Sequence, residues 1–105
     1  MTDLSPRELV ERMDGGELWC LLDVREPWER EIAAVAGSLD IPMAEIPARL
    51  GELDRDRPVA VLCHSGGRSA RVAAFLAQQG FSRVANVSGG IDAWSTEIDD
   101  AIPRY

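Results

Sequence analysis

The sequence predicts an α/β fold in which a parallel sheet is covered by helices on both faces. Short apolar runs at residues 18–24, 58–62 and 81–87 predict strands, and segments with helical signals lie between them. Apolar runs of this length, bounded by turn residues, are typical of strands buried on both faces. Because strands and helices alternate along the chain, we expect right-handed parallel crossovers.

The first predicted element is a helix with a complete start signal. Ser5 stands at the N-cap, Pro6 at the first helical position, and Glu8 at the third, where it completes a capping box. Gly15 and Gly16 end this helix. The face that it is expected to bury consists of Leu9, Val10 and Met13.

The remaining elements follow from the same signals. Further helices are expected at residues 27–35, 44–53, 69–79 and 91–94. Gly37 and Gly80 end two of them, and Pro47 restarts or kinks a third. A short additional strand is expected at 38–41.

Composition excludes several classes of protein. The 105 residues suffice for one domain, which we expect to cover residues 1–105. Hydrophobic residues make up 46% and charged residues 28%, the balance of a folded globular protein. The net charge of −7, with no basic run, argues against nucleic-acid binding. All eleven cations are arginine, which excludes lysine Schiff bases and a Walker-type phosphate lysine.

Membrane, cofactor and metal sites are not expected either. No stretch approaches the roughly 20 apolar residues of a membrane span. The segment from Met1 to Arg7 lacks the apolar region of a secretory signal, so we expect a cytoplasmic protein with reduced thiols. The only soft metal ligands are Cys20, Cys63 and the neighbouring His64, so we expect no metal and no cofactor.

The segment that carries chemistry runs from Cys63 to Ser69, with the sequence Cys-His-Ser-Gly-Gly-Arg-Ser. A buried strand would deliver Cys63 to the carboxyl edge of the sheet, where open α/β folds bind ligands. A loop before a helix can turn its N–H groups inward and form an anion cradle, and Gly66 and Gly67 would allow the positive φ angles required. We therefore expect the Cys63 thiol to have a lowered pKa and to act as a nucleophile, rather than as a buried structural cysteine.

The other side chains near this loop have less specific signals. Arg68 either adds a cation at the rim of the cradle or braces the loop. His64 is expected to point away from Cys63 and to lie at the surface or rim. Cys20 lies in an apolar strand without a cradle and is expected to pack there. The tryptophans are expected to be core or half-buried packing residues, namely Trp19, Trp28 and Trp94.

Four segments together carry a family resemblance. They are Leu22-Asp-Val-Arg-Glu26, Trp28-Glu-Arg-Glu31, Cys63-His-Ser-Gly-Gly-Arg-Ser69 and Gly89-Gly-Ile-Asp-Ala-Trp94. With these segments in this order, the chain resembles the single-domain rhodaneses, the thiosulfate sulfurtransferase family. The resemblance implies the rhodanese fold, a central parallel sheet of about five strands between helices. The chain departs from the family pattern at Ala34 and Ala36, where members commonly carry His and Pro.

The resemblance also implies a double-displacement reaction. Cys63 attacks the outer sulfur of a donor such as thiosulfate, sulfite leaves, and a persulfide remains on Cys63. Cyanide or a thiol then accepts that sulfur. Inward N–H groups from Ser65, Gly66, Gly67, Arg68 and Ser69 would hold the anionic outer sulfur.

The family segment after the first apolar strand leaves two interpretations of its charged residues. Arg25 either lies near the substrate anion, or is a buried brace paired with Glu31 or another acid while Asp23 accepts loop N–H groups. Arg71 either extends the positive rim or lies on a solvated helix face.

Alternative functions remain open. A sulfur-relay module would pass persulfide sulfur from a desulfurase to a sulfur-carrier or thiolation partner. The segment from Gly89 to Tyr105 resembles rhodanese modules fused to sulfur-carrier-activating enzymes. A non-catalytic binding module is disfavoured because Cys63 is present. Phosphatase or arsenate reductase chemistry is disfavoured because Cys63 and Arg68 form Cys-x4-Arg, whereas cysteine phosphatases use Cys-x5-Arg, a wider loop that surrounds a tetrahedral anion.

Overall fold

A computed structural model describes residues 2–105 and contains one five-stranded sheet in which all strands are parallel. The order across the sheet is β1-β5-β4-β2-β3. The strands are β1 (Thr2–Leu4), β2 (Cys20–Asp23), β3 (Leu39–Asp40), β4 (Val59–Leu62) and β5 (Val84–Val87). The predicted α/β class and parallel sheet are confirmed.

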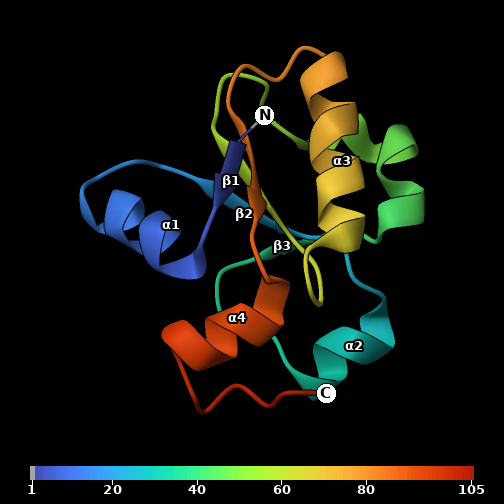
Figure 1. Cartoon of the computed structure of the whole chain (residues 1–105). Coiled ribbons are helices and arrows are strands. Elements are labelled where there is room, and N and C mark those ends of the chain that lie inside the picture. The colour runs from blue at the N-terminus through green and yellow to red at the C-terminus, as the bar shows by residue number, and fades with distance from the viewer. Residues whose placement is uncertain (1) are drawn as a thin grey trace.

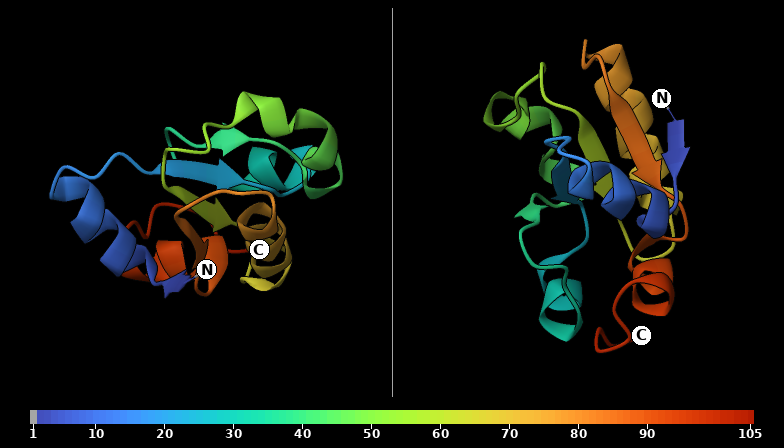
Figure 2. Two further views of the ribbon diagram at one scale, coloured as in Figure 1. Left: turned by 90° about the horizontal axis from the view of Figure 1, so that it is seen from above. Right: turned by 90° about the vertical axis from the view of Figure 1, so that its left-hand side faces the viewer.

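Helices cover both faces of the sheet, as predicted (Figures 1 and 2). They are α1 (Pro6–Asp14), α2 (Pro27–Ile32), α3 (Gly67–Gln78) and α4 (Gly90–Glu97). Two 3-10 helices, Met43–Glu45 and Pro47–Glu52, lie on the side of α3. Figure 1 shows α1 and α4 on the opposite side, with the end of the chain beside α2.

The sheet separates two apolar cores, and β4 contributes to both. Val59 and Val61 pack into the core on the α3 side, whereas Ala60 and Leu62 pack into the core under α1 and α4. All four residues are at most 1% exposed. Burial on both faces explains why β4 is continuously apolar and holds the following residue, Cys63, in a fixed place.

The start of α1 is confirmed, but β1 was not predicted. Ser5 Oγ accepts a hydrogen bond from Glu8 N (3.1 Å), and Glu8 Oε1 accepts one from Ser5 N (2.9 Å). β1 has three residues, of which Thr2 and Asp3 are exposed, so it carries no apolar run. Its pairing with β5, distant in the sequence, makes it a strand.

Several boundaries and burial predictions were wrong. Leu18 is 76% exposed and lies outside β2, and α2 ends at Ile32 because Ala33 is extended. Residues 44–53 form 3-10 turns rather than an α-helix. Met13 and Trp28 are 38% and 59% exposed, because they lie on solvent-facing sides of short helices.

The turn into α4 approaches the loop after β4 very closely. Ile91 N donates to Cys63 O (2.8 Å) and Asp92 N donates to His64 O (3.1 Å). Gly90, at φ +60°, immediately precedes Ile91, and a Cβ there would fall 2.4 Å from the carbonyl oxygens of both Cys63 and His64. Glycine is therefore required for α4 to hold the loop in place.

We predict that Gly90→Ala lowers the free energy of unfolding by about 3 kcal/mol, because the added methyl group would overlap the backbone of Cys63 and His64 and φ at residue 90 is positive. Urea unfolding measures this. Gly51→Ala is the matched control, since nothing lies within 4 Å of a Cβ there. Equal stability of the two variants would contradict the close approach.

Candidate active site

Cys63 follows directly after β4 and is 1% exposed. Its Sγ accepts a hydrogen bond from Gly66 N at 3.1 Å and lies 3.2 Å from Ser69 Oγ. The positive end of α3, which starts at Gly67, lies next to the sulfur. The anion cradle expected from the sequence is thus present as hydrogen-bond donors around one buried sulfur atom.

The loop itself is shorter than predicted. α3 begins at Gly67 rather than Ser69, so Arg68 belongs to the first helical turn. Gly66 has the expected positive φ (+111°), but the same expectation for Gly67 was wrong, because Gly67 already belongs to the helix. One left-handed residue is enough to turn the chain from β4 into α3.

The surroundings of Cys63 favour its anionic form. Burial opposes the charge and raises the pKa, but the Ser69 hydroxyl and the backbone N–H groups of Ser69, Gly66 and Ser65 outweigh it. The pKa of the Cys63 thiol is therefore lowered from its ordinary value. Hydrogen bonds to the charged form, rather than a neighbouring base, are the cause.

Arg68 braces the loop, one of its two predicted interpretations. Its guanidinium forms a bidentate pair with Glu29 of α2, at 2.6 and 2.7 Å. Glu29 is 3% exposed and also accepts from Glu26 N (2.9 Å). The Arg68 pair, against the effect of burial, lowers the pKa of Glu29 to about 2, with help from Glu26 N and the Tyr105 hydroxyl. Arg68 is thus directed at α2 rather than at the sulfur.

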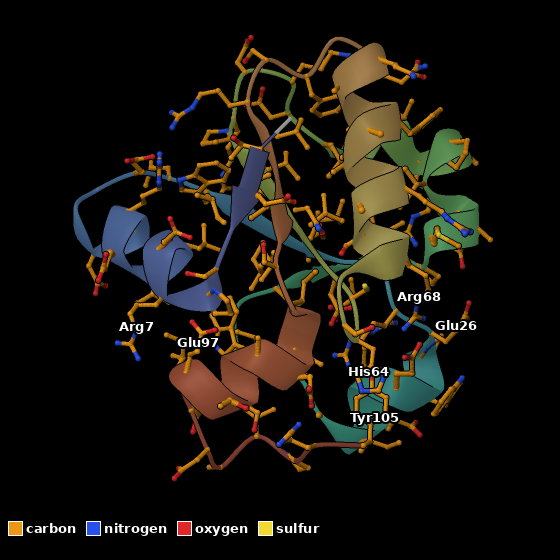
Figure 3. All side chains as sticks on the ribbon, viewed as in Figure 1. Arg7, Glu26, His64, Arg68, Glu97 and Tyr105 are labelled. Atoms are coloured by element: carbon orange, nitrogen blue, oxygen red, sulfur yellow. The ribbon has the colours of Figure 1, made fainter. Side chains whose placement is uncertain are left out.

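Tyr105 joins this cluster, and sequence analysis assigned it no role. Its hydroxyl donates to Glu29 Oε1 (2.9 Å) and accepts from Arg25 Nη1 (3.0 Å). Its ring stacks on His64, with centroids 3.9 Å apart and planes inclined by 8°. Figure 3 shows the two rings lying against each other beside Arg68 and Glu26. His64 is therefore a half-buried residue at the rim, packed by the end of the chain.

The two remaining candidate arginines lie away from the sulfur or on the surface. Arg25 is fully buried and paired with Asp23 (2.7 Å), so the brace interpretation holds, with Asp23 rather than Glu31 as the acid that pairs with it. Asp23 also accepts from Arg25 N, and Arg25 donates to Ala33 O. Arg71 is exposed on α3, and within residues 2–105 it has no ion pair.

Cys20 lies at the other end of the sheet. It starts β2 and pairs with Val59 at the start of β4, whereas Cys63 follows the end of β4. Burial raises the pKa of the Cys20 thiol, with a smaller opposing effect from Arg57. Within residues 2–105, no cluster of His, Cys, Asp and Glu is arranged to hold a metal ion. No helix of that part is long and apolar enough to cross a membrane.

Comparison with known proteins agrees with this geometry. The sequence profile of the rhodanese-like domain matches residues 5–97. The chain belongs to the rhodanese-like domain family. A sulfurtransferase of Allochromatium vinosum is 38% identical over 95 residues, covering 90% of this chain and 89% of that protein. The crystal structure of a rhodanese-related protein from Thermoplasma volcanium superposes with a TM-score of 0.83 at 36% identity, covering 93% and 94% of the two chains.

A longer relative contains a similar domain. The probable adenylyltransferase/sulfurtransferase MoeZ of Mycobacterium tuberculosis is 35% identical over 104 residues, which are 97% of this chain and 26% of that protein. This rhodanese-like chain therefore spans about a quarter of that relative's length. The family and the fold that the sequence motifs implied are confirmed.

We predict that Glu29 stabilises the fold in a pH-dependent manner. Its pKa of about 2 lies below the ordinary 4.5, so its contribution is complete above pH 4.5 and is lost as the pH falls toward 2. Glu29→Gln should therefore lower the free energy of unfolding by about 3 kcal/mol at pH 7, with the difference shrinking below pH 4.5.

Urea unfolding of both proteins from pH 7 to pH 3 measures this difference. Glu31→Gln, an exposed glutamate of the same helix, is the control and should show a much smaller effect. A Glu29→Gln difference that stays constant across this range would mean that the carboxylate charge does not stabilise the loop.

Proposed function

We propose that the protein is a sulfurtransferase that moves a sulfane sulfur from thiosulfate, or a similar donor, to a thiol or cyanide through a persulfide on Cys63. The carrying observation is the buried Cys63 sulfur, which accepts from backbone N–H groups such as that of Gly66 and has the Ser69 hydroxyl 3.2 Å away. Such donors stabilise a negative charge on sulfur without a general base. Similarity to a named sulfurtransferase over most of both chains supports the same reaction class.

In the first half-reaction, the Cys63 thiolate attacks the outer sulfur of the donor. A sulfur–sulfur bond forms to Sγ, the sulfur–sulfur bond within thiosulfate breaks, and its electron pair leaves on sulfite. The outer persulfide sulfur carries the negative charge. The N–H groups at the start of α3 would stabilise that charge, as they stabilise the thiolate.

In the second half-reaction, the acceptor attacks the outer sulfur. The new bond to cyanide carbon or to a thiol sulfur forms, and the persulfide bond breaks. Its electron pair returns to Sγ as a thiolate, so that Cys63 ends as it began. The donors that lower the pKa of Cys63 also make it a good leaving group here.

A sulfur relay between proteins is the second candidate function. MoeZ, named as an adenylyltransferase and sulfurtransferase, contains a similar domain. Trp28 is 59% exposed and packs edge-on against Tyr105, so a large aromatic side chain lies exposed near the candidate site. A desulfurase or a sulfur carrier would then be the partner. Steady-state turnover with thiosulfate, mercaptopyruvate and a desulfurase-bound persulfide as donors separates the two functions.

Phosphatase chemistry fits less well. Arg68, in the first turn of α3, is paired with Glu29 at 2.6 and 2.7 Å, so its guanidinium is not directed at an anion above Cys63. The loop donates to a single sulfur atom, and Cys-x4-Arg is shorter than the phosphatase pattern.

We predict that Cys63 takes up one sulfur atom from thiosulfate and that cyanide removes it. Intact-mass measurement should show one added sulfur in the wild type and in Cys20→Ala, and none in Cys63→Ala. Cys20→Ala is the matched control, because Cys20 lies at the opposite end of the sheet. Sulfur uptake by Cys63→Ala would disprove the assignment.

A further inference from the structure

The Ser69 hydroxyl lies between two groups that compete for its proton. It is 3.2 Å from Cys63 Sγ and donates to Asn86 Oδ1 at 2.5 Å. Ser69 is fully buried and Asn86 is 7% exposed, so bulk water does not reach this contact freely. A hydroxyl has one proton and cannot donate to both groups at once. When it donates to Asn86, the sulfur can only donate to Ser69 Oγ, which requires the thiol form.

The orientation of the Asn86 amide is set from a distant part of the chain. β1 and β5 pair in parallel with Asp3 beside Asn86, and Asn86 Nδ2 donates to Asp3 Oδ1 at 3.2 Å. Turning the amide over would place Asn86 Oδ1 against the Asp3 carboxylate, where two acceptors repel. Asp3 therefore keeps the Asn86 carbonyl directed at Ser69.

We propose that Asp3 and Asn86 are positioning residues: Asn86 competes with the Cys63 sulfur for the single Ser69 proton, and Asp3 keeps the Asn86 amide in the orientation that lets it compete. The pair acts through Ser69 and touches neither the sulfur nor a substrate. The inference deepens the proposed function, because it rests on Cys63 alternating between an anionic and a sulfur-bearing state.

The competition matches the two states of the proposed cycle. While Sγ is a thiolate, it is the stronger acceptor, and the Ser69 proton turns toward it. Asn86 Oδ1 then loses a partner, which limits how far the thiolate is stabilised. Once Sγ bears the outer sulfur, it is no longer anionic, and the proton returns to Asn86. No bond other than hydrogen bonds changes in this switch.

The charged groups around Cys63 come from several elements. Arg68 on α3 lies nearby but is paired with Glu29 of α2, and His64 is stacked on Tyr105. Asp3 on β1 is the charged residue that contacts Asn86. The side-chain hydrogen bonds of Asp3 and Asn86 join them to each other and to Ser69, and involve neither the Arg68–Glu29 pair nor the His64–Tyr105 stack.

The test is the pH dependence of iodoacetamide alkylation of Cys63 in a Cys20→Ala background. Ser69→Ala should raise the midpoint by about one pH unit, since the thiolate loses a donor. Asn86→Leu, close in size but without an acceptor, should lower it by about half a unit, because the Ser69 proton is released to sulfur. A purely structural role would not give opposite signs.

Asp3→Ala should also lower the midpoint. Two controls separate an effect transmitted through Asn86 and Ser69 from a direct effect of the Asp3 charge on Cys63. Asp100→Ala, an exposed aspartate elsewhere, should leave it unchanged. In the Ser69→Ala background, Asp3→Ala should cause no further shift. A shift that persists there would show that the Asp3 charge acts directly on Cys63, and would overturn the proposed competition for the Ser69 proton.

An unchanged or raised midpoint in folded Asn86→Leu would also overturn it. Circular dichroism checks folding, and if Asn86→Leu does not fold, the Asp3→Ala comparison decides. Alkylation needs no sulfur donor. If the wild type takes no sulfur from thiosulfate, only the proposed function fails, and the alkylation midpoints still test the competition for the Ser69 proton.

Discussion

Backbone N–H groups directed at the Cys63 sulfur are the interaction on which this structure depends. They arise because α3 starts only a few residues after β4, so that the helix N-terminus faces the residue that the strand delivers. A charge on the sulfur of Cys63, a residue that is 1% exposed, would otherwise be costly. Burial raises the pKa of Cys63, and the hydrogen bonds donated to its sulfur lower it. Together the hydrogen bonds have the larger effect, so the pKa is lowered.

The rest of the scaffold keeps those donors in place. β4, buried on both faces, fixes Cys63 from one side, and the first N–H groups of α4 bind the carbonyls of Cys63 and His64. On the outer side, Glu29 holds Arg68 and Tyr105 covers His64. The arginines near the site therefore maintain the loop geometry, and the candidate reaction relies on dipoles and hydroxyls instead of free cations.

The sequence supported much of this account, for identifiable reasons. The helix start at Ser5, the buried strand before Cys63 and the loop after it are local signals, and the structure contains all three. What it missed depends on contacts between distant residues. Tyr105 meets Glu29 across 76 positions, and Asn86 meets Asp3 across 83. No local pattern predicts such contacts, so their roles, and that of the short strand β1, required the fold.

The reaction proposed for Cys63 depends on surroundings that stabilise its thiolate and lower its pKa. The most direct measurement is the ultraviolet absorbance of the thiolate as a function of pH in Cys20→Ala, where Cys63 is the only cysteine. We expect a midpoint below the value of about 8.5 for a free cysteine. A midpoint at or above that value would mean that burial outweighs the hydrogen bonds and that the loop does not stabilise the Cys63 thiolate.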